Sequence, residues 1–571
     1  MSTLSLKSIL AVAALIGGSA FVTAQQPSPL VTQAAEKSVA VLQSPASTVK
    51  EKTDACRQLA VIGGPSALPA LVALLPDEQL NHMARYALET IPDPAVDDAL
   101  RGALDKLSGR PLVGVIDSLG VRRDRKAIPA LSQRLRAPDA DVAQAAARAL
   151  GAIGTPDAAQ AIDAALADVP AENRLAFCEG LLRATETIAA TGDTTLALRF
   201  YDRLRNLADA PHQVRAGAWR GAILTRGPEG LALLRDAWLS SDHIQTAAAA
   251  RAAMEMPGPG VTRLLTSMLD QLTGDKKVLA LQVLGKRGDT AAIPALSTAA
   301  QGGDKAIRLA AIQALPELAS DAAVAPLTRL LEDADGQIAK AAQEALAAIP
   351  GEAVDATVTK MLASSSPAER LTAIDLIGRR RMAASVPALM KAATDPDASV
   401  RPAALKRLGE LSDPAQLPAL LDLLVKAGSS ADRDAAEQAV SAVSARAADP
   451  AASVSQVTRL LAAAQPEAKG ALLRVLTSVG GPDALKAVRA ALDNSNPEVR
   501  AAAIRAMGSW KTEDVAPELL ALARSSGSPT EKLLALRGYF GWASNPELPA
   551  ERRLAMCQQA AGVVQQPEDK K

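Results

Sequence analysis

A short apolar-Pro-Ala-Leu segment recurs along the chain, and this repetition constrains the fold more than any other feature of the sequence. Successive prolines of the segment are 60, 165, 32, 61, 31 and 99 residues apart, and each spacing is a multiple of 30–33 residues. A period of this length indicates stacked units of one kind, each too small to bury its own apolar face. The prolines are Pro69, Pro129, Pro294, Pro326, Pro387, Pro418 and Pro517.

Each unit contains the signatures of two helices. The proline lies in the first turn of the first helix, where its missing N–H costs no hydrogen bond. A polar turn such as Asp395–Asp397 then caps a second helix, in which apolar or small residues occupy positions 0, 3, 4, 7 and 8 on one face. Four sets follow this template: Val142, Ala145, Ala146, Ala149 and Leu150; Ile307, Ala310, Ala311, Ala314 and Leu315; Ile338, Ala341, Ala342, Ala345 and Leu346; Val499, Ala502, Ala503, Ala506 and Met507. Glycines are expected to mark the ends of these helices at Gly151, Gly285, Gly378, Gly409 and Gly508.

The unit resembles the HEAT repeat, and its short form resembles the subtype called PBS-lyase HEAT-like. The resemblance implies an all-α fold, a right-handed α-solenoid of about 16 helix pairs between Thr48 and Cys557. Residues 186–211 are longer than the repeat predicts, and residues 428–465 lack its proline and turn. The turn and second-helix signature of the subtype reads Asp304-Lys305-Ala306-Ile307-Arg308, Asp397-Ala398-Ser399-Val400-Arg401 and Asn496-Pro497-Glu498-Val499-Arg500.

The two ends of the chain differ from the repeats. Residues 1–24 hold one charge, Lys7, and an apolar run that ends in Val-Thr-Ala, the pattern of a signal peptide cleaved after Ala24. An uncleaved anchor is the alternative, but it would need roughly 20 apolar residues. We expect export to the periplasm or the cell exterior. The domains would be a lead-in and N-terminal cap helix in 25–46, the solenoid in 47–557 and a polar, disordered tail in 558–571.

Composition and charge narrow the classes of partner. Lys and Arg number 62, as do Asp and Glu, so the chain has no net field to attract nucleic acid or an anionic membrane. Four Trp, three Tyr and four Phe are too few for a base-stacking platform. We therefore expect no nucleic-acid partner, no membrane span after signal cleavage, and a monomer.

The residue patterns that carry most enzyme chemistry are missing from the sequence. Its three histidines lie at least 31 residues apart, so no local zinc-binding pair exists. Asp242-His243 is interpreted as a helix cap followed by an exposed first turn, in preference to a catalytic base with its carboxylate. No paired-cysteine motif, phosphate-binding loop or nucleophile elbow is present. We expect no catalytic residue, no metal site and no cofactor.

The three cysteines are Cys56, Cys178 and Cys557, so one must stay unpaired in a monomer. Stacked helix pairs would also hold Cys56 and Cys178 too far apart for a disulfide. We therefore expect buried free thiols, with intermolecular pairing through Cys557 as the alternative.

One pattern points to binding. If the template positions are buried, position 6 of the second helix points away from the core, and four repeats place a cation there, although Gln313 and Glu344 interrupt the series. HEAT-like solenoids line their concave face with second helices, so the resemblance implies a discontinuous basic stripe in a groove, with a tryptophan at position 5. A merely solvated face is the alternative. The predicted partner-binding residues are Arg148, Trp219, Arg220, Lys406 and Arg505.

Other charged and aromatic groups are interpreted mainly as structural. Position 1 is often Arg, and Asp304 and Asp397 stand four residues before two of these arginines, where we expect ion pairs that bridge repeats. Basic runs in 122–126, 286–287 and 379–381 follow second helices and complement the helix dipole, or alternatively form an edge for acidic partners. A local recognition point at Arg85 and Tyr86 is also considered, and the aromatic cluster 539–542 is expected to seal the last repeat.

These observations favour an exported, non-enzymatic scaffold that binds a protein or peptide in the concave groove of the solenoid. One alternative is an enzyme that attaches or detaches a bilin chromophore, an activity that the subtype's name implies and that no other feature of the sequence supports. Another alternative is a passive structural element of the cell envelope.

Overall fold

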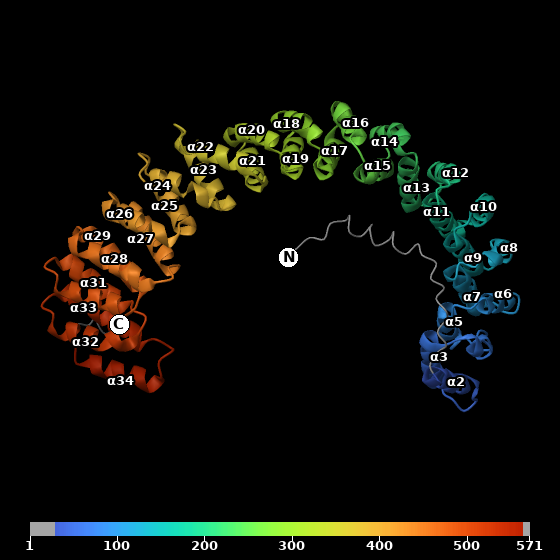
Figure 1. Cartoon of the computed structure of the whole chain (residues 1–571), viewed down its shortest axis with the longest axis horizontal. Helices are drawn as coiled ribbons and strands as arrows, with labels where there is room; N and C mark the ends of the chain where they lie inside the picture. Colours follow the sequence, from blue (N-terminus) through green and yellow to red (C-terminus); the bar gives the residue numbers. More distant parts are fainter. Residues whose placement is uncertain (1–28, 564–571) are drawn as a thin grey trace. The chain divides into compact units, whose positions relative to one another are not determined.

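The computed structural model describes residues 29–563, and every regular element within them is helical (Figure 1). These residues form sixteen helix pairs, α2–α3 to α32–α33, followed by the helix α34 (Ala550–Ala561). The predicted all-α stack of helix pairs is confirmed. The predicted signal peptide and the end of the predicted tail lie outside the described residues. The chain divides into two compact units, residues 1–283 and 284–571.

In the first unit, one set of helices opens the pairs and a second set closes them. The first helices are α2 (Pro29–Gln43), α4 (Leu68–Val72), α6 (Pro94–Ala103), α8 (Ile128–Arg134), α10 (Pro156–Ala165), α12 (Thr194–Arg205), α14 (Gly230–Leu239) and α16 (Gly260–Met268). The second helices are α3 (Val49–Ile62), α5 (Asn81–Thr90), α7 (Gly109–Val121), α9 (Ala140–Ile153), α11 (Arg174–Ala190), α13 (His212–Thr225) and α15 (His243–Glu255). The unit boundary falls within the next second helix, α17 (Gly274–Arg287).

The second unit repeats this order. Its first helices are α18 (Ile293–Gln301), α20 (Val324–Arg329), α22 (Glu352–Met361), α24 (Val386–Ala392), α26 (Leu417–Lys426), α28 (Pro450–Ala463), α30 (Pro482–Ala490) and α32 (Ala516–Ser525). Its second helices are α19 (Lys305–Ala314), α21 (Gly336–Ala348), α23 (Pro367–Arg380), α25 (Val400–Leu411), α27 (Ser430–Ala445), α29 (Pro466–Val479), α31 (Pro497–Gly508) and α33 (Pro529–Ala543).

Polar turn residues start the second helices, as their sequence predicts. The Asp139 carboxylate accepts hydrogen bonds from the N–H groups of Asp141 and Val142, at 2.9 and 3.4 Å. The side chain of Asn496 accepts one from Glu498 N–H at 2.8 Å. These bonds satisfy N–H groups that a helix start leaves free. Of the template side chains, all but Ile307, Ala341 and Ala502 are buried, and those three are half-buried.

Consecutive second helices touch through small residues. A Cβ atom built on Gly151 in α9 would lie 2.6 Å from the carbonyl oxygen of Gly180 in α11, and one on Gly508 would lie 2.9 Å from Gly538 Cα in α33. Larger side chains would push these helices apart. Figure 1 shows second helices on the inner side of the curve and first helices on the outer side, for example α9 and α11 against α8 and α10 in the first unit and α19 against α18 in the second.

This packing corrects one expectation from the sequence. Gly151, Gly285, Gly378 and Gly409 lie inside their helices, two or more residues before the last helical residue, and only Gly508 ends its helix. Gly378 gives space to the guanidinium of Arg407, since a Cβ atom there would lie 2.4 Å from Arg407 Nε. The glycines occur late in the helices because the neighbouring repeat comes closest there.

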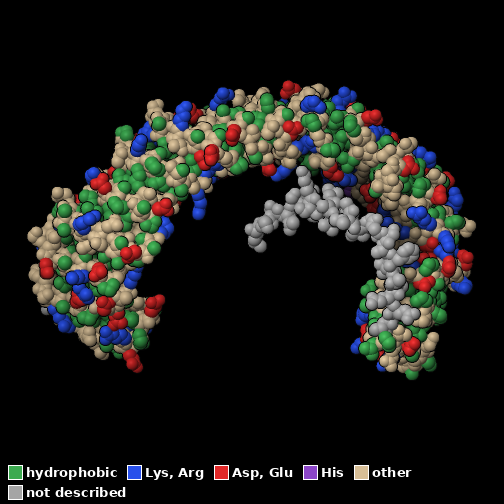
Figure 2. Space-filling view, viewed as in Figure 1, with side chains coloured by type: hydrophobic (Ala, Val, Ile, Leu, Met, Phe, Trp, Pro, Cys, Tyr) green, Lys and Arg blue, Asp and Glu red, His purple; other side chains and the backbone are tan. Residues whose placement is uncertain are grey.

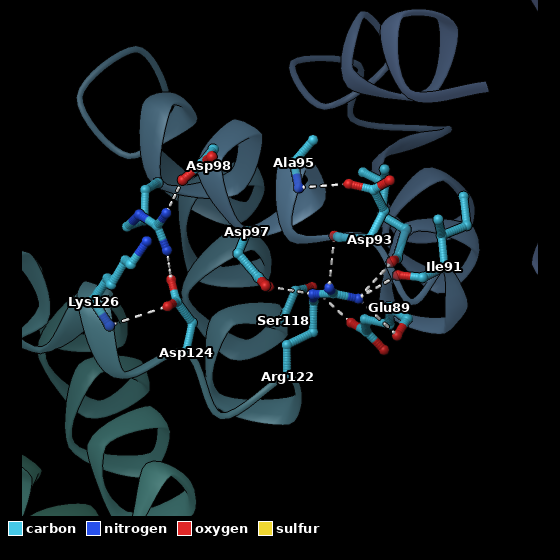
Figure 3. Close-up of polar contacts among 12 residues, drawn as sticks. Glu89, Ile91, Asp93, Ala95, Asp97, Asp98, Ser118, Arg122, Asp124 and Lys126 are labelled. Atoms are coloured by element: carbon cyan, nitrogen blue, oxygen red, sulfur yellow. Dashed lines mark hydrogen bonds and ion pairs between the residues drawn. The ribbon is translucent and has the colours of Figure 1, made fainter. Parts of the chain in front are cut away.

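An arginine at the end of a second helix caps the second helix of the preceding repeat (Figure 3). The side chain of Arg122, which follows α7, also pairs with the carboxylate of Asp97. In the second unit, Arg380 makes the same set of contacts to the end of α21 and pairs with Asp355 at 2.7 Å. Arg122 donates to the carbonyl oxygens of Leu88, Glu89, Ile91 and Asp93 at 2.8–3.2 Å.

These contacts decide how two of the basic runs are used. Free carbonyls at a helix end carry the negative end of the helix dipole, so a guanidinium is favourable there. The dipole interpretation of the runs 122–126 and 379–381 is confirmed for Arg122 and Arg380, but the helix that benefits belongs to the preceding repeat.

The cysteines are free, as predicted, and Cys56 and Cys178 are buried whereas Cys557 is exposed. Burial raises the pKa of the Cys56 and Cys178 thiols to about 11. Within the described part of the chain, no helix is both long enough and apolar enough to cross a membrane.

We expect a thiol reagent to modify one cysteine of the native protein near pH 8, because only Cys557 is accessible and only the thiolate reacts. After denaturation, three thiols should react. Absorbance titration with a disulfide reagent gives both numbers, and a Cys557→Ser variant should show none in the native state. Fast reaction of two or more native thiols would contradict the buried positions.

We expect Arg380→Met to lower the free energy of unfolding by about 2–4 kcal/mol, because it leaves several carbonyls and Asp355 without their partner. Arg379→Met is the matched control: Arg379 is 45% exposed and, within the described residues, its ion pair is with Asp375 only, so the substitution should cost less than about 1 kcal/mol. Urea unfolding followed by circular dichroism measures both. Equal losses would contradict the capping role.

Candidate functional site

The side chains at position 6 of the second helices form the candidate site. Within each run, position 6 recurs at steps of 31 residues, with one step of 41 between Glu179 and Arg220, and none of the predicted cations there is buried. Figure 2 shows basic and acidic side chains interspersed over the visible face of both units. In the first unit the series runs Tyr86, Asp117, Arg148 and Glu179, then Arg220 and Arg251; in the second it runs Gln313, Glu344, Asp375 and Lys406.

The two predicted cations of the first unit, Arg148 and Arg220, each lie near a carboxylate. Arg148 lies between Asp117 and Glu179 in the series, and its Nη2 is 4.0 Å from Asp117 Oδ1. Burial raises the pKa of Asp117, and the charge of Arg148 acts against that rise. Arg220 is bound through two nitrogens by Glu255 of α15, and this hydrogen bonding lowers the pKa of Glu255. Because Asp117 and Glu179 flank Arg148 at position 6, the first unit has no unbroken basic stripe along its described second helices.

The expectation that Trp219 lies exposed beside these cations is wrong. Its side chain is 7% exposed, and the Arg205 guanidinium carbon lies 4.7 Å from the centre of its ring. Position 5 is also buried at Ala147 and Ile504, so the buried face of the second helix is wider than the template assumes. α12, the first helix of this pair, packs on α13 and brings Arg205 over the ring.

The second unit contains unbalanced cations. Lys406 and Arg505 are both exposed, and no ion pair is found for either within the described residues. Two further arginines, Arg474 in α29 and Arg537 in α33, occupy position 6 and were not predicted from the sequence. Their distances of 31 and 32 residues from Arg505 could have revealed them, but the unclear repeat boundaries in 428–465 hid the first.

The arginines at position 1 are structural, as predicted, but their partners differ from the prediction. Arg500 donates to the carbonyls of the preceding turn and pairs with Glu531 of the next repeat at 2.9 Å. Arg401 likewise pairs with Asp432, and Arg308 with Asp333. Asp304 and Asp397 instead accept backbone N–H groups near the starts of their second helices. A side chain four residues earlier lies outside the helix, so helical spacing does not apply to it.

The structure gives different roles to the three local candidates, Arg85, Tyr86 and Asp242. Arg85 is bound between repeats, with Nε 2.8 Å from Asn81 Oδ1 and Nη1 3.1 Å from Ser118 Oγ, and burial lowers its pKa. Tyr86 is 48% exposed and remains available at position 6. Asp242 caps α15 by accepting from Ile244 N–H at 2.9 Å, which confirms its interpretation as a cap.

The end of the stack is sealed as expected. Tyr539 is 1% exposed, and its hydroxyl donates to the carbonyl oxygen of Met556 at 3.1 Å. Phe540 meets its ring edge-on, with the centroids 6.1 Å apart. These contacts fix α34 against α33 and close the core after the last pair.

Comparison with known proteins identifies the repeat. The sequence profile of the family described as HEAT repeats matches residues 113–181, 273–347, 355–441 and 455–538, which is more than half of the chain. No curated protein matches the sequence.

Solved structures of helical-repeat proteins are also similar. A Kap95p structure described as inducing the switch loops of RanGDP aligns with 94% of this chain and 87% of its own at 11% identity, with a TM-score of 0.44. The Kap95:Nup1 complex aligns with 94% of this chain and 80% of its own at 14% identity, with a TM-score of 0.38. Human deoxyhypusine hydroxylase in complex with glycerol aligns with 56% of this chain and 97% of its own at 19% identity, with a TM-score of 0.20. On the profile match, together with the sixteen helix pairs, the chain belongs to the HEAT-repeat family.

Proposed function

We propose that this protein is an exported, non-enzymatic scaffold whose second helices bind a protein or an extended peptide. One observation carries the proposal: position 6 presents a solvent-accessible side chain from successive second helices, from Tyr86 in α5 to Arg537 in α33. The tightly packed core beneath fixes the spacing of these side chains. A rigid, regularly spaced row of this kind suits recognition of an extended partner.

The non-enzymatic part of the proposal rests on the sequence and on the use made of its polar groups. The buried or half-buried arginines Arg122, Arg380 and Arg500 are committed to carbonyls and carboxylates that join repeats. Asp242, next to a histidine, is committed to a helix start and to Arg215. Repeats contact only their neighbours, which limits how distant residues could assemble a catalytic group.

We place the site of action outside the cytoplasm, in the periplasm or beyond, because of the signal-peptide pattern that ends at Ala24. The protein would act as a monomer there.

We expect the exported protein to begin at Gln25, which intact-mass spectrometry of protein from the envelope or medium would establish. Ala24→Arg should block processing, since the cleavage site requires a small residue, and leave a heavier, cell-associated chain. Ala34→Arg, ten residues on, is the control and should be processed normally. Recovery of the full-length chain in the cytoplasm would contradict export.

We expect a photo-crosslinking side chain to capture the partner when it replaces Tyr86 or Gln313, which lie at position 6 of second helices. Controls carry the same group at Gln160 in α10 and Lys486 in α30, which are exposed on first helices. Irradiation of the producing cells, followed by mass spectrometry, should give adducts at the first two sites only. Adducts at all four sites, or at none, would contradict binding by the second helices.

A further inference from the structure

The last three second helices, α29, α31 and α33, share one charge pattern. Each has a glutamate and a lysine or arginine within its first turn, and beyond that turn each carries a single charged residue. That residue is an arginine at position 6 in every case. We call Arg474, Arg505 and Arg537 the arginine row.

The members of the arginine row stand on neighbouring helices. α31 packs against both α29 and α33, and Gly508 meets Gly538 at the closest point of the second contact. Small residues precede or follow the row by one turn: Gly470 and Ala501 at position 2, and Ser509 and Gly541 at position 10. Position 2 of α33 differs, because Leu533 there is large and 37% exposed. An extended chain along the row would therefore meet small side chains on α29 and α31 and an apolar one on α33.

The charges of the row are unevenly neutralised. Arg474 is held by Glu437 of α27, with nitrogen-to-oxygen distances of 2.6–2.9 Å, and lies 3.8 Å from Asp434. Arg505 and Arg537 are exposed, and within the described residues no ion pair involves either. Two positive charges on adjacent helices therefore have no counter-charge among the described residues. Folding does not require a positive charge at either position, because both side chains face solvent.

The rest of the second unit's position-6 face is mostly acidic, with neutral Gln313 in α19 and one cation, Lys406 in α25. Glu344 and Asp375 occupy position 6 in α21 and α23, and Asp434 and Glu437 lie on α27. The sign of the exposed charge changes between α27 and α29. The Glu437–Arg474 pair at this border shows that a carboxylate fits the face, because it binds the guanidinium side-on through both oxygens.

We propose that the arginine row binds an acidic, extended segment of the partner protein, an inference that rests on the proposed function and names the partner's chemistry. Packed helices lie about 8–10 Å apart. A polyproline-II segment advances about 9 Å in three residues and returns its side chains to the same face. Carboxylates at every third residue of such a segment therefore match successive arginines of the row.

A designed peptide tests this proposal with the full-length mature protein. The probe is a fluorescein-labelled peptide with the triplet Glu-Pro-Ala repeated four times, measured by fluorescence anisotropy at low and high salt. One control peptide has Gln in place of Glu, and a second has the same composition with its four glutamates adjacent. We expect the evenly spaced acidic peptide to bind most tightly and to lose affinity as salt screens the charges.

Two double variants distinguish the effect of the arginine row on binding from the effect of the protein's net charge. Arg505→Glu with Arg537→Glu should weaken binding of the probe by about tenfold or more. The control changes Arg459 in α28 and Lys486 in α30 to Glu, which alters net charge equally on first helices, and should change the affinity less than about twofold. Glu437→Gln should raise the affinity by about twofold, because it releases Arg474 for the probe.

Three results would overturn the proposal: equal binding of both acidic peptides, equal loss in the two double variants, or tighter binding of duplex DNA or phosphatidylglycerol vesicles than of the probe. The crosslinking experiment at Tyr86 and Gln313 uses other helices. Adducts there without binding of the probe would therefore remove this inference and leave the proposed function in place. Probe binding without adducts would show an acidic-peptide site on the last helices and contradict binding by the other second helices.

Discussion

The close approach of consecutive second helices is the constraint on which the rest of the structure depends. Alanine and glycine at the contacts, such as Gly151 against Gly180, let backbones meet where larger side chains would separate them. The separation of these helices is then set by backbone contact. Because each second helix is held in this way against the next, position 6 forms a row of exposed side chains along successive helices.

Arginine serves three purposes here, and its place in the second helix decides which. At position 1, Arg500 joins a turn to the next repeat; at the helix end, Arg122 and Arg380 close the preceding helix; at position 6, Arg505 faces solvent. The first two sites place the guanidinium among backbone carbonyls, where it replaces hydrogen bonds that a helix end would leave unmade. Only the third leaves it available to another molecule.

The sequence predicts the period, the helix pairs and the buried face, because all three follow from local spacing. It also places Arg148, Lys406 and Arg505 correctly at the surface. It fails where the answer depends on a neighbouring repeat. Trp219 is covered because α12 brings Arg205 over it, and Arg122 acts on carbonyls about 30 residues earlier. Such contacts become visible only when the stacking is known, and the same holds for the carboxylates that balance Arg148 and Arg220.

Whether an exposed arginine has a carboxylate beside it matters more for binding than whether the arginine is present. An exposed arginine beside a carboxylate, like Arg474 beside Glu437, gains little for stability and offers little to a partner. Within the described residues neither Arg505 nor Arg537 has an ion-pair partner, so a carboxylate of another molecule could bind either guanidinium without displacing one. Because position 6 faces away from the core, the fold is indifferent to its charge. The uncompensated pair is therefore better explained by recognition of an anionic segment than by stability.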